Sequence, residues 1–163
     1  MKNAAIYAGT FDPLTYGHMD IIERSSELFE EVVVAVAIAT PKQVLFSVEE
    51  RVEMVKEATK HFKNVKVESF DNMLVNFARK IGAKILIRGL RAYSDFEYEF
   101  QMALTNRKLA PEIETLFLMP REMHSYVSSS SVKEVAKLGG DVSSFVPPLV
   151  ANFIAAKFKK HVS

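Results

Sequence analysis

Short apolar runs recur along the chain and alternate with segments whose apolar residues are three or four positions apart. The runs at 4–8, 32–39 and 84–87 are rich in β-branched and small apolar residues and are too short for helices. Each of them predicts a buried strand of a parallel sheet. Residues 65–68 alternate between apolar and charged side chains, which predicts an edge strand, and residues 114–119 predict a fifth strand.

Amphipathic segments lie between the first apolar runs. The segment after His18 predicts a helix because its apolar residues have helical spacing, namely Met19, Ile22, Leu28 and Phe29. A second helix, to about residue 60, is expected to begin with a capping box in which the Ser47 side chain faces the N–H of Glu50. Its charged residues are expected on a solvated face: Glu49, Glu50, Arg51, Glu53, Lys56 and Glu57.

Two further helices are predicted in the second half of the chain. Asp71 or Asn72 is expected to cap a helix that ends at Gly82 and has one apolar side, made by Leu74, Phe77, Ala78 and Ile81. Ser94 or Asp95 is expected to cap a long helix to about residue 108. Its packing stripe is predicted to be Phe96, Phe100, Ala103 and Leu104.

A short helix at 132–138 and a last helix beginning at Pro148 complete the alternation of strand and helix. The pattern predicts the α/β class, with a Rossmann-like, doubly wound sheet of about five parallel strands and helices on both faces. We expect a single domain over residues 1–163. Ligands bind at the carboxyl edge of such sheets, where Lys42 and Arg88 follow the second and fourth predicted strands.

Composition and charge exclude several functions. The 163 residues carry 21 basic and 20 acidic side chains, a formal charge of +1, so no overall basic field favours nucleic acid. The chain has no cysteine, which excludes disulfides, thiolate catalysis and Cys-ligated metals. No apolar stretch approaches the roughly 18 residues that span a bilayer, so we expect no membrane association and a cytoplasmic protein.

Two stretches predict anion sites. Residues 5–18 run from the first predicted strand through a turn, where Gly9 is expected to let the backbone approach a ligand, to His18 in the first turn of a helix. Free N–H groups and the helix dipole attract anions there. The serine run 128–131 opens another helix, so its hydroxyl and N–H groups predict a second anion site.

Motifs in four stretches carry a resemblance to a known family. Residues 15–18 are a Thr-x-Gly-His form of the His-x-Gly-His signature of nucleotidyltransferases, and Gly-Thr-Phe-Asp-Pro at 9–13 precedes it. Over nearly its whole length the chain resembles the bacterial phosphopantetheine adenylyltransferases, most clearly at 7–20, 46–51, 87–91 with 95–99, and 127–134. Ala8 stands where the family usually has proline, and Pro41 directly precedes Lys42, whereas the family proline commonly lies two residues upstream of this lysine.

The resemblance implies adenylyl transfer from ATP to 4'-phosphopantetheine, with dephospho-coenzyme A and pyrophosphate as products. It implies that His18 stabilises the transition state and that the acceptor is bound by Thr10, Lys42, Leu74 and Arg88. It implies that ATP is bound by Thr10, Phe11, His18, Gly89, Leu90, Arg91, Glu99, His124, Ser125, Tyr126, Val127, Ser128, Ser129 and Ser130. Arg91 and the N–H groups of Gly89 and Leu90 are expected on the ATP phosphates, and Glu99 is expected to orient Arg91 or a hydrated metal.

The resemblance also implies a homohexamer and inhibition by coenzyme A. Mg²⁺ is expected to arrive with ATP, because no carboxylate cluster in the sequence looks like a metal site of its own. Two alternatives stay open. The chain could be a nucleotidyltransferase with another acceptor, such as nicotinamide mononucleotide or glycerol phosphate, or a non-catalytic sensor of ATP or coenzyme A.

Overall fold

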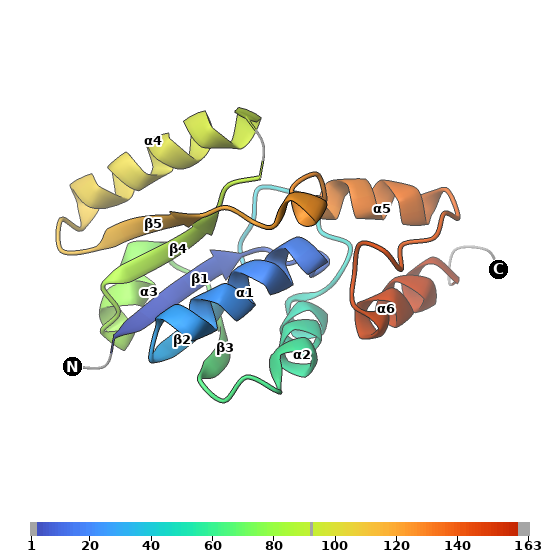
Figure 1. The fold of residues 1–163 in the computed structure, drawn as a ribbon, viewed down its shortest axis with the longest axis horizontal. Coiled ribbons are helices and arrows are strands. Elements are labelled where there is room, and N and C mark those ends of the chain that lie inside the picture. The colour runs from blue at the N-terminus through green and yellow to red at the C-terminus, as the bar shows by residue number, and fades with distance from the viewer. Residues whose placement is uncertain (1–2, 92, 160–163) are drawn as a thin grey trace.

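Five parallel strands form the centre of the fold in the computed structural model, which describes residues 3–91 and 93–159 (Figure 1). The sheet has the order β3-β2-β1-β4-β5. Its strands are β1 (Ala4–Gly9), β2 (Glu31–Ala37), β3 (Val65–Phe70), β4 (Ile85–Gly89) and β5 (Glu114–Leu118). In the register of the sheet, Ile6 of β1 lies between Val33 of β2 and Leu86 of β4. The predicted parallel sheet and its edge strand at β3 are confirmed.

The helices cover both faces of this sheet. They are α1 (Tyr16–Leu28), α2 (Val48–Thr59), α3 (Leu74–Ile81), α4 (Tyr93–Leu109), α5 (Ser129–Lys137) and α6 (Pro148–Lys159), with a short 3-10 helix at Glu122–His124. Figure 1 shows α1 and α2 in front of the strands and α3 behind them. Val32, Val34 and Val36 of β2 pack toward α1 and α2, whereas Val33 and Ala35 pack toward α3. The doubly wound architecture is therefore confirmed.

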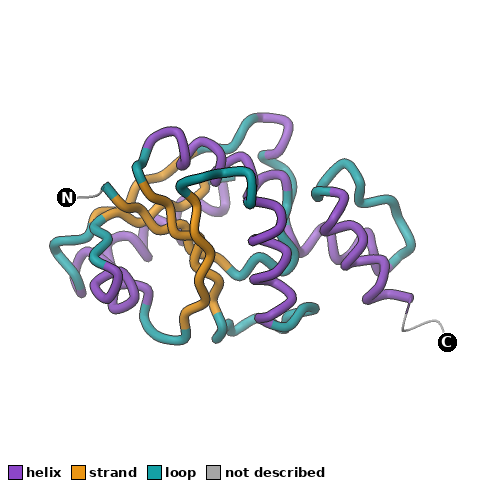
Figure 2. The backbone as a smooth tube through the Cα atoms, turned by 90° about the horizontal axis from the view of Figure 1, so that it is seen from below, coloured by secondary structure: helices purple, strands orange, loops and turns teal. Residues whose placement is uncertain are grey.

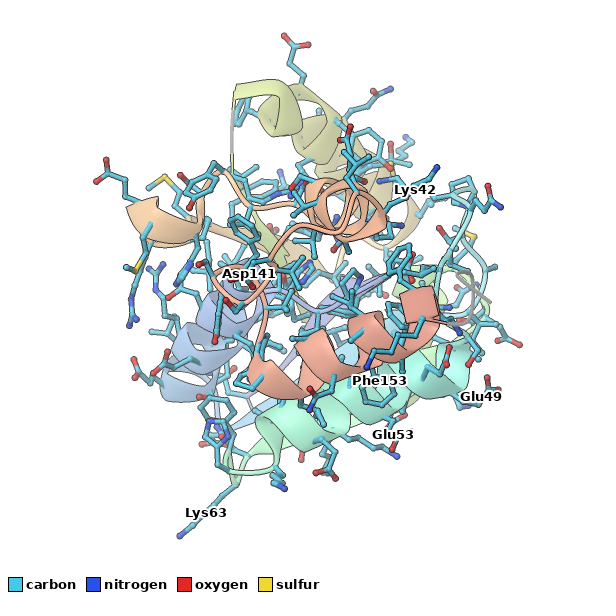
Figure 3. All side chains as sticks on the ribbon, turned by 90° about the vertical axis from the view of Figure 1, so that its right-hand side faces the viewer. Lys42, Glu49, Glu53, Lys63, Asp141 and Phe153 are labelled. Atoms are coloured by element: carbon cyan, nitrogen blue, oxygen red, sulfur yellow. The ribbon has the colours of Figure 1, made fainter. Side chains whose placement is uncertain are left out.

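The direction of winding reverses at β1. The chain runs from β1 through β2 to β3 on one side, and then returns to place β4 and β5 on the other side. In open α/β sheets a crevice forms at such a switch point, outside the carboxyl ends of the strands. Helix α5 lies beyond these ends (Figure 1), and the C-terminal helix stands apart from the strands (Figure 2). Phe153 of α6 points toward α2 (Figure 3), and its ring centroid lies 6.5 Å from that of Phe46.

The capping predictions have different outcomes. At α2 the capping box is confirmed, because the Ser47 hydroxyl accepts from the Glu50 N–H at 3.2 Å and the Ser47 N–H donates to the Glu50 carboxylate at 2.9 Å. The predicted Asp71 or Asn72 cap of α3 is wrong, because Met73 occupies the N-cap and no side chain caps the helix. The polar residues lie too early in the sequence to reach its first N–H groups.

The predicted burial of one residue in α2 and of one residue in α1 is also wrong. Arg51 was expected on the solvated side of α2 but is 2% exposed, while Glu49 and Glu53 of the same helix are exposed and point outward (Figure 3). Leu28 was expected on the apolar side of α1 but is 62% exposed, because it is the last residue of the helix. Ile22 is buried as predicted, and Ile21, which was not predicted, is buried beside it.

The predicted packing stripe of α4 is only partly covered within the chain. Phe96, Phe100 and Leu104 are each about half exposed, and Tyr98 and Met102 are exposed as well. Apolar side chains are spread around this helix, which runs beside β5 at the edge of the sheet (Figure 1), so one sheet cannot cover them all. The Ser94 and Asp95 side chains expected to cap the helix lie outside the described part of the structure.

Candidate active site

A cavity of about 220 Å³ opens at the carboxyl ends of β1 and β4, where the winding of the sheet reverses. Twelve of the residues predicted from the sequence line it: Thr10, Phe11, His18, Lys42, Arg88, Gly89, Arg91, Glu99, Val127, Ser128, Ser129 and Ser130. They come from segments that are far apart along the chain. The topology therefore brings the two predicted anion sites and the strand-end cations to one cavity.

His18 is held in one orientation by the turn before it. Thr15 is the N-cap of α1, and its hydroxyl accepts from the His18 N–H. The Thr15 backbone N–H in turn donates to Nδ1 of His18 at 3.0 Å. Because Nδ1 accepts this hydrogen bond, the proton of the neutral imidazole is on Nε2, which becomes the donor.

The His18 imidazole is neutral in this environment. Burial, together with the positive charges of Arg91 and Arg88, lowers its pKa from the ordinary value of 6.5 to about 3. The Phe11 ring lies edge-on to the imidazole, with centroids 5.0 Å apart. His18 therefore offers a fixed N–H donor that can hydrogen-bond to an anion without first needing a proton.

Phe11 explains the glycine at the end of β1. Its φ is 52°, in the left-handed region, and its ring folds back over the strand end. A Cβ built at Gly9 would lie 3.1 Å from the tip of that ring. The absence of a side chain at Gly9 therefore makes room for the Phe11 ring. Gly9 also lines the cavity, so the expectation that its backbone approaches a ligand stays a prediction.

Arg88 and Glu99 form a bidentate ion pair at the cavity wall, with N···O distances of 2.8 and 2.6 Å. Arg88 also donates to the Ala8 carbonyl at 2.7 Å. Although burial by itself would lower the pKa of Arg88, the hydrogen bonds and charge of Glu99 raise it above the usual value. Glu99 was expected to orient Arg91 or a metal, but the carboxylate orients Arg88. Arg91 donates to the Val127 carbonyl at 3.0 Å.

The serine run divides its functions between structure and cavity. Ser128 and Ser131 form a capping box that begins α5, with the Ser128 hydroxyl accepting from the Ser131 N–H at 3.0 Å. The Ser129 hydroxyl donates to the Pro13 carbonyl at 2.8 Å. The N–H groups of Ser129 and Ser130, in the first turn, precede any intrahelical acceptor and are available to an anion.

Five predicted site residues do not line the cavity. Leu74 begins α3 and packs against the core behind the sheet. Leu90 was expected to offer its N–H to phosphate, but that group donates to the Leu118 carbonyl at 3.0 Å. Ser125 donates to the Glu122 carbonyl, Tyr126 is 71% exposed, and the His124 ring stacks on Tyr16 with centroids 5.8 Å apart.

Sequence reasoning missed several residues that shape the cavity. Tyr7 and Thr15 line it, and Asp12 and Arg51 lie behind it among the buried polar groups. Burial raises the pKa of the Tyr7 phenol in spite of the nearby arginines. The Gly-Thr-Phe-Asp-Pro and Glu-Glu-Arg motifs contained Asp12 and Arg51, but only their partners in space show what they do.

Charge at the cavity is mainly positive. Lys42, Arg88 and Arg91 line it together with hydroxyl groups, and among the described residues Glu99 is the one carboxylate of the lining. Within residues 3–91 and 93–159, no three His, Asp or Glu side chains gather as a metal site. Cations and fixed N–H donors without a nucleophile suit the binding and transfer of phosphoryl groups. None of the described helices is long and apolar enough to cross a membrane.

Comparison with known proteins agrees with this chemistry. Residues 6–135 match the model of the cytidylyltransferase-like family. The chain is 54% identical over 156 residues to a phosphopantetheine adenylyltransferase of Caldanaerobacter subterraneus subsp. tengcongensis, covering 96% of this chain and 98% of the relative. It is 54% identical over 154 residues to one of Heliobacterium modesticaldum, covering 94% and 92%. A Vibrio parahaemolyticus structure, provisionally assigned as a nicotinate-nucleotide adenylyltransferase, shares the fold with a TM-score of 0.75 at 18% identity, covering 100% of this chain and 98% of the other.

Proposed function

Because the chain belongs to the phosphopantetheine adenylyltransferases, within the cytidylyltransferase-like family, we propose that it joins the adenylyl group of ATP to 4'-phosphopantetheine. A phosphate oxygen of the acceptor attacks the α-phosphorus of ATP. The bond to the bridging oxygen then breaks, and pyrophosphate leaves with the electron pair. The products are dephospho-coenzyme A and pyrophosphate. The observation that carries the proposal is the fixed Nε2 donor of His18 within a cavity lined by cations.

The residues act by alignment and charge stabilisation. Nε2 of His18 donates to a non-bridging oxygen of the α-phosphate, and this hydrogen bond strengthens as negative charge develops. Arg91 and the first turn of α5, at Ser129 and Ser130, receive the β- and γ-phosphates, and they remain with the departing pyrophosphate. Such transfers need little covalent assistance from the protein, because most of the barrier is lowered by positioning and electrostatics.

The acceptor phosphate lies on the opposite side of His18 in this proposal. Lys42, the Thr10 hydroxyl and Arg88 supply its positive charge and donors. The pairing of Glu99 with Arg88 holds the guanidinium at a fixed angle, so less side-chain entropy is lost when the phosphate binds. The planar fork of arginine suits this position better than a lysine would.

Three further properties belong to the same proposal. Mg²⁺ arrives with ATP and is held by phosphates and water, which lowers the charge on the leaving group. Coenzyme A inhibits by occupying the cavity, because it contains both the pantetheine arm and an adenosine phosphate. The enzyme works in the cytoplasm, and the lack of cysteine is compatible with a reducing compartment.

We also propose that the protein is a homohexamer in which the apolar side chains of α4 are covered by another copy. The rings of Phe96 and Phe100 stack with centroids 5.7 Å apart, and both side chains are about half exposed. Leu104 of α4 and Leu116 of β5 are exposed as well. Exposed apolar patches of this kind on a soluble chain commonly mark association surfaces. Leu116 belongs to β5, which is an edge strand of the sheet.

One assay tests the proposed reaction. The protein is incubated with MgATP and 4'-phosphopantetheine, and dephospho-coenzyme A is measured by mass spectrometry beside pyrophosphate release. Nicotinamide mononucleotide and glycerol phosphate are run as competing acceptors. Product formation with phosphopantetheine, and not with the other two acceptors, supports the proposal. Faster turnover of another acceptor, or binding of ATP without any turnover, contradicts it and favours one of the two alternatives.

A further inference from the structure

A buried carboxylate lies behind the cavity, at Asp12. Its side chain is 5% exposed, and it accepts from the backbone N–H groups of Leu45 and Phe46 at 2.9 Å each. The segment that ends at Phe46 also carries Lys42. Asp12 therefore joins the loop of Thr10 to the loop that presents the lysine.

Helix α5 reaches the same carboxylate from the other side. Lys133, one turn into this helix, places its Nζ 2.7 Å from the Asp12 carboxylate, and its side chain is 26% exposed. The Ser129 hydroxyl of the same helix donates to the carbonyl of Pro13, the next residue of the loop. Two adjacent loop residues are thus tied to the helix whose first turn faces the cavity.

Arg51 supplies a third connection from behind. Its guanidinium donates to the Thr10 carbonyl at 2.9 Å, to the Ala37 carbonyl at 2.8 Å and to the Phe46 carbonyl at 3.2 Å. These contacts are to the backbone, so they fix the path of the chain rather than a side-chain rotamer. Arg51 and Asp12 hold the two acceptor loops together, and Lys133 is the charged link from them to α5.

We propose that the Lys133–Asp12 ion pair is a positioning device that sets the separation between the acceptor end of the cavity and its ATP-phosphate end. The proposal rests on the proposed function. Lys133 does not line the cavity and is therefore not a catalytic residue. In-line transfer between two bound phosphates depends on their alignment, and a displacement of about 1 Å can cost on the order of 100-fold in rate.

The ion pair can be removed without unfolding the helix. Val132 of α5 is 1% exposed and packs in the core with Val127 and Val150, so apolar contacts keep α5 docked. Asp12 keeps its two backbone N–H donors when the ammonium is lost. We therefore expect Lys133→Met to shift α5 relative to the acceptor loops while the protein stays folded.

The kinetic test compares Lys133→Met with Lys137→Met, an exposed lysine of the same helix. Lys133→Met is expected to lower kcat about 10- to 100-fold while the KM values for ATP and phosphopantetheine change less than about threefold, because alignment is lost and binding is kept. Lys133→Arg, which can restore the ion pair, is expected to recover most of kcat. Lys137→Met should stay within about twofold of the unchanged protein.

A double-variant cycle separates this link from two independent effects. Asp12→Asn alone should lower kcat, and Lys133→Met added to Asp12→Asn should lower it no more than about twofold further, because the partners act as one unit. A double variant that instead loses kcat by the product of the two single losses would overturn the proposal. So would a Lys133→Met protein with normal kcat, one that Lys133→Arg does not rescue, or one whose defect is confined to KM.

A distance measurement tests the proposal without activity. The chain has no cysteine, so spin labels at Gln43→Cys and Glu134→Cys, both exposed positions, report the separation of the acceptor loop and α5 by pulsed electron paramagnetic resonance. Labelled protein is diluted into unlabelled protein to suppress distances between copies. Lys133→Met should broaden or shift the distribution, whereas Lys137→Met should not. An unchanged distribution overturns the positioning role even if no adenylyl transfer is found, an outcome that would separately contradict the proposed function.

Discussion

The carboxyl edge of β1 and the outer edge at α4 and β5 differ in the kind of side chain they present. At the first, buried polar groups are paired through specific hydrogen bonds, such as Arg51 to three carbonyls and Arg88 to Glu99. At the second, apolar side chains such as Phe100 remain exposed. The polar groups of the first edge have their partners within the chain, whereas the second edge leaves apolar side chains exposed and is the surface that we propose contacts another copy.

This difference matches a specific site at the first edge and the proposed assembly at the second. Rearranging a polar network in a partly buried site costs free energy, because each displaced group would lose its hydrogen-bond partner. It therefore keeps the cavity in one arrangement. An apolar surface is non-directional and gains free energy from any complementary cover, so it suits association. The two edges can therefore be changed separately by substitution.

The largest effect is expected for His18→Ala. Loss of the Nε2 donor should lower kcat about 100- to 1000-fold, as for removal of one preorganised donor to a developing charge. Pyrophosphate release measures the rate, and calorimetric titration with ATP should show little change in affinity. His61→Ala, at an exposed histidine of the α2–β3 connection, is the control. A His18→Ala enzyme within about tenfold of normal kcat would remove His18 from the mechanism.

Arg51→Met is expected to be next. Three buried or half-buried carbonyls lose their donor, so the free energy of unfolding should fall by about 3 kcal/mol. Urea denaturation at one fixed protein concentration measures this change. Lys56→Met, on the exposed side of the same helix, should change stability by less than about 0.5 kcal/mol. Equal effects of the two substitutions would show that the buried guanidinium does not hold the loops together.

Phe100→Asp should break the apolar edge and leave the cavity unchanged. A carboxylate at a covered interface lacks a partner and is costly to desolvate, so multi-angle light scattering should show the assembly dissociating. Leu28→Asp replaces an equally apolar and more exposed residue, 62% against 48%, at the end of α1. It should leave the assembly intact. If the assembly persists in Phe100→Asp, the α4 edge is not an interface.

The smallest expected effect concerns pH: His18 should not titrate near neutral pH. The folded-state pKa of His18, at about 3, is below its ordinary value of 6.5, so the unfolded chain binds a proton first. Its contribution to stability is therefore constant above about pH 7 and decreases as the pH falls from about 6.5 toward 3. In NMR spectra of the substrate-free protein, the His18 ring signals should not move between about pH 8 and pH 5. A titration midpoint near 6.5 would contradict the neutral, desolvated imidazole.

Local signals in the sequence were sufficient for much of the fold and part of the site. The apolar runs predicted all five strands, the capping box at Ser47 was predicted from four consecutive residues, and His18 was placed correctly in the first turn of a helix. These features depend on near neighbours, because hydrogen bonds in caps and the spacing of apolar residues act over a few positions. The resemblance then pointed to most of the cavity lining.

The partners of the charged residues were decided only by the tertiary structure. Lys133 and Asp12 are 121 positions apart, and Arg51 lies 41 positions from Thr10, so no local pattern separates these charges from the solvated ones beside them. The same holds for α4, whose apolar residues are spread too widely around the helix for one sheet to cover them all. Periodicity determines which side chains could be buried together, and only the packing of distant segments determines which of them are.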